Sequence, residues 1–157
     1  MSERSVVHGD FTLERLYDHP AQRVFGAFAT QAAKAEWFNG GPEQTIVESI
    51  FDFRPGGAER VVGRWRDGTV SQFDARYFDI VPGERIVYAY EMHINERKIS
   101  VSLATLEFRA DGAATRLRLT ENGAFLDGYD DAGSRERGTR QLLEQIAAAL
   151  ARTEARA

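Results

Sequence analysis

Between residues 44 and 120 the sequence divides into short segments of alternating or apolar residues, each closed by a turn signal. Steps such as Asp67-Gly68 and Asn122-Gly123 favour tight reversals of the chain. Links this short join neighbouring antiparallel strands. The pattern therefore predicts a six-stranded antiparallel meander, with strands at Thr45–Phe53, Ala58–Trp65, Val70–Val81, Ile86–Ile94, Ile99–Phe108 and Thr115–Thr120.

The segment before the meander predicts one more strand and two short helices. Phe11–Tyr17 alternates with period two, as a strand does. Pro20 ends that strand and suits the first turn of a helix, which we expect Asp18 or His19 to cap. A second short helix is expected over Ala32–Phe38, before a Gly-Gly-Pro sequence.

The C-terminal region differs in kind, because Asp131–Arg152 has no proline and is rich in alanine and leucine. Leu142, Ile146 and Leu150 lie four apart, which predicts one long amphipathic helix. Gly138 falls one turn earlier on the same stripe, where we expect it to allow a close approach to the sheet. The fold class is therefore α+β, with a curved antiparallel sheet of about seven strands around a long C-terminal helix.

Length and composition exclude several classes of protein. A chain of 157 residues is expected to form a single domain, residues 1–157, with a structured core over about 5–152. The absence of cysteine excludes thiol catalysis, disulfides and thiolate metal sites. A net charge of −4 argues against nucleic-acid binding. No apolar run reaches the roughly 18 residues of a membrane span, and residues 1–8 lack a secretory leader, so we expect a cytoplasmic protein.

Catalytic and cofactor motifs are missing from the sequence. It contains no Gly-x-Ser-x-Gly elbow and no glycine-rich phosphate loop, so no cofactor is expected. His8, His19 and His93 are far apart and lack a second ligand at helical spacing, so no metal site is expected. For His93 two interpretations stay open, an exposed or edge-strand histidine and a catalytic base.

Glu121 and Arg135 form a candidate polar pair. Glu121 ends an apolar strand face, and a carboxylate in that position must find a partner or take a raised pKa. Arg135 shares a helical face with Leu142 and is a suitable partner. The pair would either be a structural ion pair at the start of the helix or contact a ligand.

Aromatic residues make up 11% of the chain, and alternation places many of them on one face of the sheet. Opposite a single helix, these rings either line an apolar cavity with a few polar groups or fill a solid core. The candidate cavity residues are Trp37, Phe51, Phe53, Trp65, Phe73, Tyr88, Tyr90, Met92, Glu121, Arg135 and Leu142.

Two strands have an uncertain register. In Ile99–Phe108 the apolar residues shift from odd to even positions, which predicts a bulge. In the middle of Val70–Val81 the pattern leaves open which of Arg76, Tyr77 and Phe78 points inward.

Local sequences in this order resemble the START-like (SRPBCC, birch-pollen-allergen-like) superfamily, and within it bacterial proteins similar to the activator of heat-shock protein 90 ATPase. The resemblance covers about residues 11–150 and rests on residues 18–25, 35–38, 53–57, 78–87, 119–123 and 138–143. It implies a helix-grip fold, in which a seven-stranded sheet wraps around the C-terminal helix and encloses a hydrophobic cavity. Relatives bind lipids, sterols or polyketide-like aromatics, and some catalyse cyclisation or dehydration.

Three hypotheses on function follow. The first is a protein that binds a hydrophobic or aromatic small molecule in the cavity. The second is a cyclase/aromatase or dehydratase that uses Glu121 or a tyrosine hydroxyl in the same cavity. The third is a protein–protein module, such as a chaperone cofactor or a homodimer, built on apolar surface at Ile99, Val101 and Leu103 if these residues face outward.

Overall fold

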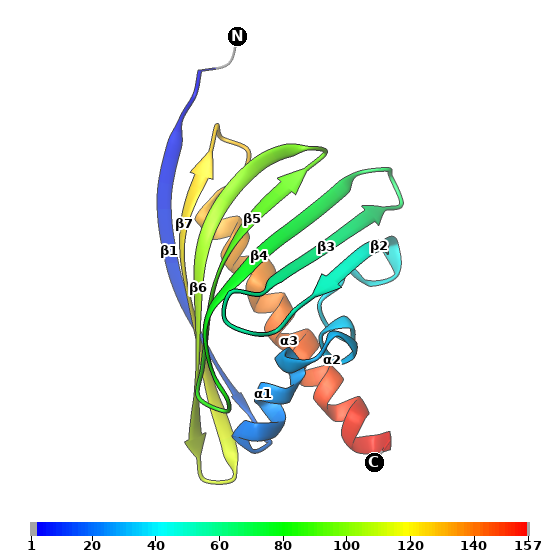
Figure 1. Ribbon diagram of the computed structural model, residues 1–157, viewed down its shortest axis with the longest axis vertical. Coiled ribbons are helices and arrows are strands. Elements are labelled where there is room, and N and C mark those ends of the chain that lie inside the picture. The colour runs from blue at the N-terminus through cyan, green and yellow to red at the C-terminus, as the bar shows by residue number, and fades with distance from the viewer. Residues whose placement is uncertain (1–2, 157) are drawn as a thin grey trace.

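Seven antiparallel strands form one curved sheet, and a long C-terminal helix lies against its concave face (Figure 1). The computed structural model describes residues 3–156. The strands are β1 (Val6–Tyr17), β2 (Gln44–Phe51), β3 (Ala58–Trp65), β4 (Val70–Val81), β5 (Arg85–Ile94), β6 (Arg97–Asp111) and β7 (Ala114–Leu126). The helices are α1 (Ala21–Ala29), α2 (Gln31–Ala35), the short 3-10 helix η1 (Gly41–Glu43) and α3 (Ala132–Arg156). The expected α+β helix-grip fold is confirmed.

The strands follow the order β1-β7-β6-β5-β4-β3-β2, so β2 to β7 form the expected meander. Strand β1, which two helices separate from the meander, pairs antiparallel with β7 along its whole length. The first and second strands are therefore the two edges of the sheet. Helices α1 and α2 bridge from one edge to the other across one end of it (Figure 1).

Bulges resolve both uncertain registers. On β4 the extra residue is Phe78, so Tyr77 points into the core and Phe78 is exposed. On β6 the extra residue is Ile99, which is buried, and beyond it the even-numbered residues face inward. Val101 and Leu103 therefore lie on the outer face. The bulge exists as expected, but it lies at the start of the apolar run rather than in its middle.

The expected turn at Asn122-Gly123 is wrong. These residues lie inside β7, which pairs with β1 on one side and β6 on the other, and the reversal comes at Asp127 and Gly128, both with positive φ. Gly123 serves a close approach instead, since a Cβ there would lie 2.9 Å from the Phe125 ring and 3.0 Å from the Ser102 hydroxyl. A glycine that packs tightly inside a strand and one in a turn look alike in sequence.

The helix caps also differ from expectation. Neither Asp18 nor His19 caps α1, whose N-cap is Pro20 without a side-chain hydrogen bond. Thr30 does act as a cap, because its hydroxyl accepts from the Ala33 N–H and starts α2 immediately after α1.

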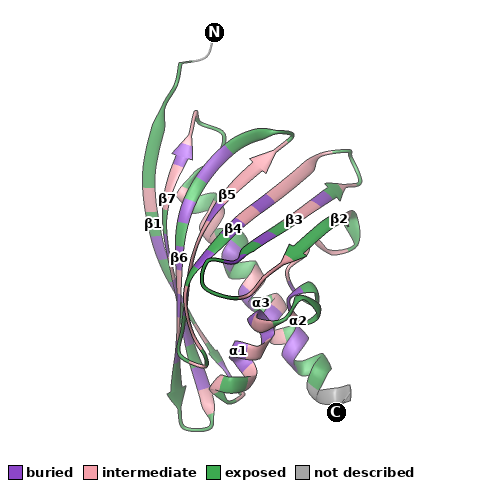
Figure 2. Ribbon diagram, viewed as in Figure 1, coloured by how far each residue is buried: buried purple, intermediate pink, exposed green. Residues whose placement is uncertain are grey.

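Most of the buried apolar side chains of α3 lie from its middle towards its C-terminus. They are Leu143, Ile146, Ala149 and Leu150, and they join a core that includes strand residues such as Leu117. Buried segments of helix and sheet are purple in Figure 2. The Tyr17 hydroxyl, from the end of β1, donates to the Leu143 carbonyl at 2.8 Å. Among the described residues, no helix is long and apolar enough to cross a membrane.

Two leucines of β6 test which residues of this strand face the core. Leu106 is 0% exposed and Leu103 is 42% exposed. Truncating a fully buried leucine to alanine typically costs about 2–5 kcal/mol, whereas surface substitutions usually change stability by less than about 0.5 kcal/mol. We expect Leu106→Ala to lower the free energy of unfolding by the larger amount and Leu103→Ala to leave it nearly unchanged in urea denaturation. Equal losses would contradict the register of β6.

Candidate functional site

A cavity of about 410 Å³ lies between the concave face of the sheet and the part of α3 that runs from Arg135 to Ile146. Ligand pockets commonly occupy about 300–1,000 Å³, so this volume can hold a small molecule. The apolar part of the wall comes from residues such as Phe28, Val61, Leu119, Leu142 and Ile146. Val61 and Leu119 reach the cavity through simple alternation, because every second side chain of a strand faces the helix.

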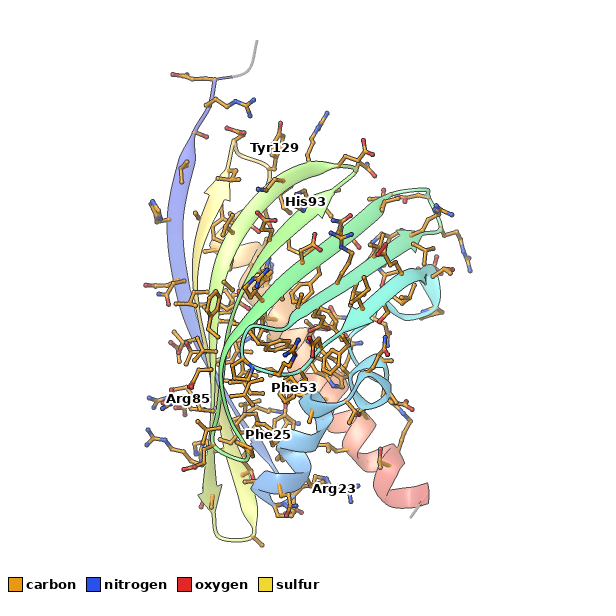
Figure 3. The ribbon with its side chains drawn as sticks, viewed as in Figure 1. Arg23, Phe25, Phe53, Arg85, His93 and Tyr129 are labelled. Carbon is orange, nitrogen blue, oxygen red and sulfur yellow. The ribbon has the colours of Figure 1, made fainter. Side chains whose placement is uncertain are left out.

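All but two of the side chains expected from the sequence lie in this wall. They are Trp37, Trp65, Phe73, Tyr88, Tyr90, Met92, Glu121, Arg135 and Leu142. The exceptions are Phe51 and Phe53, which stack on each other with ring centroids 5.7 Å apart. Phe53 also packs edge to face on Phe25 of α1, with ring centroids 5.9 Å apart (Figure 3). Both rings pack against the hydrophobic core, so the aromatic residues form part of a solid core and part of a cavity wall.

A polar cluster around Tyr90 lies in the cavity wall. The Tyr90 hydroxyl donates to Glu121 Oε1 at 2.6 Å and accepts from Arg135 Nη1 at 2.9 Å. Arg135 Nη2 donates to the Ser100 hydroxyl at 2.8 Å and to Asp130 Oδ2 at 2.9 Å. Glu121 and Arg135 therefore meet as expected, but through the tyrosine hydroxyl, and the closest ion pair of Arg135 is with Asp130.

Burial governs the protonation of this cluster. It raises the pKa of Glu121 above the usual value, although the Tyr90 hydrogen bond and the Arg135 charge act in the opposite direction. It also raises the pKa of Tyr90, and the negative charge of Glu121 adds to that effect. The cluster therefore keeps its tyrosine protonated and holds a carboxyl group that is easier to protonate than one in water.

Sequence reasoning missed a second polar cluster, at Lys34. The Lys34 ammonium lies 2.6 Å from Glu59 Oε1, and the Tyr77 hydroxyl donates to the same oxygen at 2.6 Å. The side chains of Lys34 and Glu59 are 7% and 2% exposed. Burial lowers the pKa of Lys34, and the charge of Glu59 partly offsets this. A lysine in a short helix normally predicts a solvated position, so no local signal indicated this pair.

Aromatic rings surround the Lys34 ammonium. Nζ lies 4.7 Å from the centroid of Phe38, 5.5 Å from that of Phe73 and 5.8 Å from that of Tyr88, which all belong to the cavity wall. Rings at such distances attract a cation through their quadrupole. Lys34 is itself a cavity-lining residue, so the amine lies where the apolar wall and the Glu59 pair meet.

Gly138 has a different role from the one expected. No atom lies within 4 Å of the position that a Cβ would occupy there, so the glycine does not bring α3 close to the sheet. It is exposed and lines the cavity. The missing side chain therefore leaves open space at this part of the wall.

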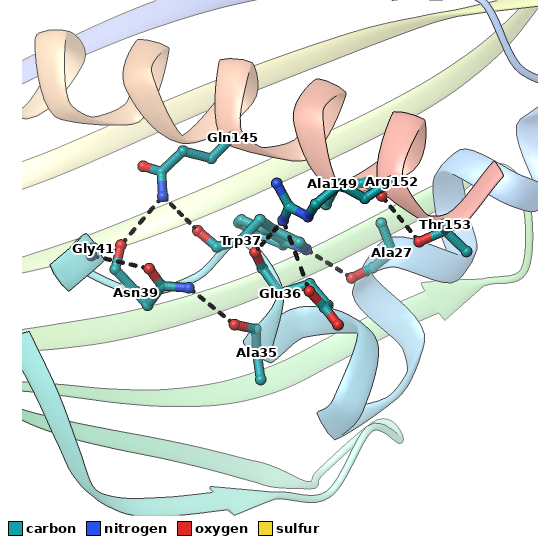
Figure 4. A network of polar contacts seen from close by, with 10 residues as sticks. All are labelled: Ala27, Ala35, Glu36, Trp37, Asn39, Gly41, Gln145, Ala149, Arg152 and Thr153. Atoms are coloured by element: carbon teal, nitrogen blue, oxygen red, sulfur yellow. Dashed lines mark hydrogen bonds and ion pairs between the residues drawn. The ribbon is translucent and has the colours of Figure 1, made fainter. Parts of the chain in front are cut away.

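Hydrogen bonds tie α3 to the segment after α2, which forms part of the wall (Figure 4). The Gln145 amide donates to the carbonyls of Trp37 and Asn39, at 3.1 and 3.3 Å. The Trp37 indole N–H donates to the Ala27 carbonyl at 2.9 Å, and Arg152 donates to the Glu36 carbonyl at 3.0 Å. These bonds fix Trp37 relative to the helix.

His93 lies outside the cavity, in a cluster on the outer face of the sheet (Figure 3). Cross-strand pairing brings Asp74, Glu91 and His93 together, with one potential ligand atom of each within 4.8 Å of the others. Linear spacing could not show this. Arg60 already pairs with Asp74, and Lys98 with Glu91, each at 2.6 Å, so a cation would have to displace both. We therefore assign no metal to the cluster.

Comparison with known proteins gives the family. The model of the family described as Activator of Hsp90 ATPase homolog 1-like protein matches residues 18–151. The chain belongs to this family. The resemblance inferred from the sequence is therefore confirmed, and with it the START-like fold. No protein of curated function matches the chain.

Solved structures of similar proteins share this fold. A protein from Rhizobium leguminosarum is 42% identical, with 96% of this chain and 99% of that one covered and a TM-score of 0.91. Mll3558 from Rhizobium loti is 46% identical, with 92% and 99% covered and a TM-score of 0.86. The AHSA1-like protein from Aeromonas hydrophila shares the fold at 12% identity, with 93% and 94% covered and a TM-score of 0.71.

The raised pKa of Glu121 predicts a pH dependence of stability. Because this carboxyl binds its proton more tightly in the folded chain, its contribution is fully present below the unfolded pKa of about 4.3 and is lost as pH rises through the folded value. Glu121→Gln removes the titration. We expect wild type to lose stability relative to Glu121→Gln as the pH rises from about 4 to 7 in urea denaturation. A difference that stays constant with pH would contradict this assignment.

Proposed function

We propose that the protein binds a small hydrophobic molecule in the cavity between α3 and the sheet. The observation that carries the proposal is the open volume of about 410 Å³ behind a wall of aromatic and aliphatic side chains. Buried apolar surface supplies most of the binding energy in such sites, and a few placed polar groups set the orientation. The fold also favours this function, because START-like proteins commonly bind hydrophobic ligands.

The polar cluster at Tyr90 indicates which ligands fit. Arg135 donates to Tyr90, Ser100 and Asp130, and a guanidinium carries five N–H donors, so it can also donate to an oxygen of a ligand. The ligand we propose has an apolar or aromatic body and a carbonyl, hydroxyl or carboxylate oxygen at one end. Fatty acids, sterols, flavonoids and polyketide-like phenols share this chemistry.

Thermal shift with a panel of these compounds tests the proposal. A ligand at 100 times its Kd stabilises the folded state by about 2.7 kcal/mol, which for a domain of this size raises Tm by about 5–10 °C. We expect at least one class to produce such a shift at saturation. If no class does, the proposal is wrong.

A matched pair of glycine substitutions locates the binding site. Gly138→Leu adds a side chain to open space in the cavity wall, whereas Gly26→Leu makes the same change in α1, also in open space and away from the cavity. Both should stabilise their helices by about 0.5–1 kcal/mol. We expect Gly138→Leu to abolish the ligand-induced shift and Gly26→Leu to retain it.

A second candidate function is acid–base catalysis in the same cavity, of the cyclase or dehydratase kind. The specific observation is Glu121, a cavity-lining carboxyl whose pKa burial raises. A protonated carboxyl beside a bound carbonyl can act as general acid. With a compound from the panel that binds, we expect wild type to form a product that mass spectrometry detects. Glu121→Gln should keep the thermal shift and lose the product. A ligand recovered unchanged from wild type would leave binding as the only function.

A further inference from the structure

The amine of Lys34 has no role in the function proposed above, although it is buried and lines the cavity. The chain contains two lysines, Lys34 and Lys98. Lys98 lies on the surface, 44% exposed, and pairs with Glu91. Lys34 lies in the wall of the cavity, among aromatic rings and beside Glu59. If the contact between Lys34 and Glu59 only held α2 to β3, the amine would not need to face the cavity.

We propose that Lys34 captures small hydrophobic aldehydes and ketones that enter the cavity, as a reversible imine. The cavity volume limits the substrates to compact aromatic or aliphatic carbonyl compounds. The inference rests on the proposed function in one respect, since a small molecule must enter the cavity.

Glu59 lies where the reaction requires a proton acceptor. The Lys34 ammonium passes a proton to Glu59 Oε1, 2.6 Å away, and the free amine attacks the carbonyl carbon. The carbonyl oxygen takes a proton from the attacking nitrogen and becomes the hydroxyl of a carbinolamine. Glu59 then protonates that hydroxyl, water leaves, and a protonated imine remains opposite the Glu59 carboxylate. One water is released for each imine, and nothing is oxidised or reduced.

The surroundings favour the amine as a nucleophile in two ways. Desolvation disfavours the ammonium and lowers the pKa of Lys34, which increases the fraction of free base at neutral pH. The iminium product carries the same charge as the ammonium. Glu59 and the rings of Phe38 and Phe73 can therefore stabilise it as they stabilise the resting side chain.

Reductive trapping tests the proposal on the full chain. Benzaldehyde is added with sodium cyanoborohydride, which reduces an imine to a stable secondary amine, and peptide mass mapping compares the two lysines. We expect Lys34 to be labelled about tenfold faster than Lys98 in the folded protein, with the preference lost in urea. Lys34→Arg keeps the positive charge beside Glu59 but cannot form an imine, so it should remove the fast labelling. Lys98→Arg should retain it.

Benzyl alcohol separates this inference from the proposed function, because it matches the probe but lacks the carbonyl. We expect it to raise Tm and to protect Lys34, but not Lys98, from labelling. A Tm rise without preferential labelling of Lys34 overturns the imine proposal and leaves ligand binding intact. If benzyl alcohol leaves Tm unchanged and Lys34 is labelled no faster than Lys98, both proposals fail for ligands of this size.

Discussion

The cavity depends on a mismatch between a curved sheet and the single helix that packs against it (Figure 1). Leu143, Ile146 and Leu150 anchor α3 in the core from its middle towards its C-terminus. Towards its N-terminal half, Gly138 is exposed and Leu142 is only half-buried, and both line the cavity. The start of α3 is held to the sheet as well, where Ala132 leaves no room for a Cβ on Gly9 and Arg135 donates to Tyr90. The open volume lies between these two regions of contact. The open volume thus follows from the architecture, and the side chains that face it determine which molecules it suits.

The buried pair of Lys34, which lines the cavity, and Glu59 behind it is costly to bury. An apolar pair in place of a buried ion pair is often as stable, whereas removing one partner leaves an uncompensated charge. Lys34 and Glu59 are therefore poorly explained as stabilising elements, even with Tyr77 completing the hydrogen bonds of the carboxylate. The position of Lys34 in the wall lets a molecule in the cavity reach the amine, which a solid core would not allow. The same argument applies less strongly to Glu121, whose partner Arg135 is more accessible.

The sequence predicted the features that depend on local periodicity. Alternation placed Tyr88, Tyr90 and Met92 on the face towards α3, because a strand repeats every two residues whatever surrounds it. Alternation does not show how far along the sheet a residue lies. It therefore predicts Phe51 and Phe53 in the cavity wall, although both rings pack against the core beside it. The bulge at Ile99 shows in the sequence only as a shift of the apolar residues from odd to even positions. Its exact position depends on the pairing of β6 with β5. Lys34 and Glu59 left no local signal, because their burial arises only when α2 packs on β3.

The two cations of the cavity wall differ in what they can do. Of the 20 Lys and Arg residues in the chain, two are lysines, so the cation at position 34 is of a type that this chain uses rarely. A guanidinium stays charged in proteins and offers a planar set of donors, which suits Arg135 as a fixed contact for a ligand oxygen. The ammonium of Lys34 is compact enough to fit between aromatic rings and one oxygen of Glu59. Unlike a guanidinium, it can also give up its proton. The wall therefore combines a cation that can orient a ligand with one that can react with it, and only the lysine allows bond formation.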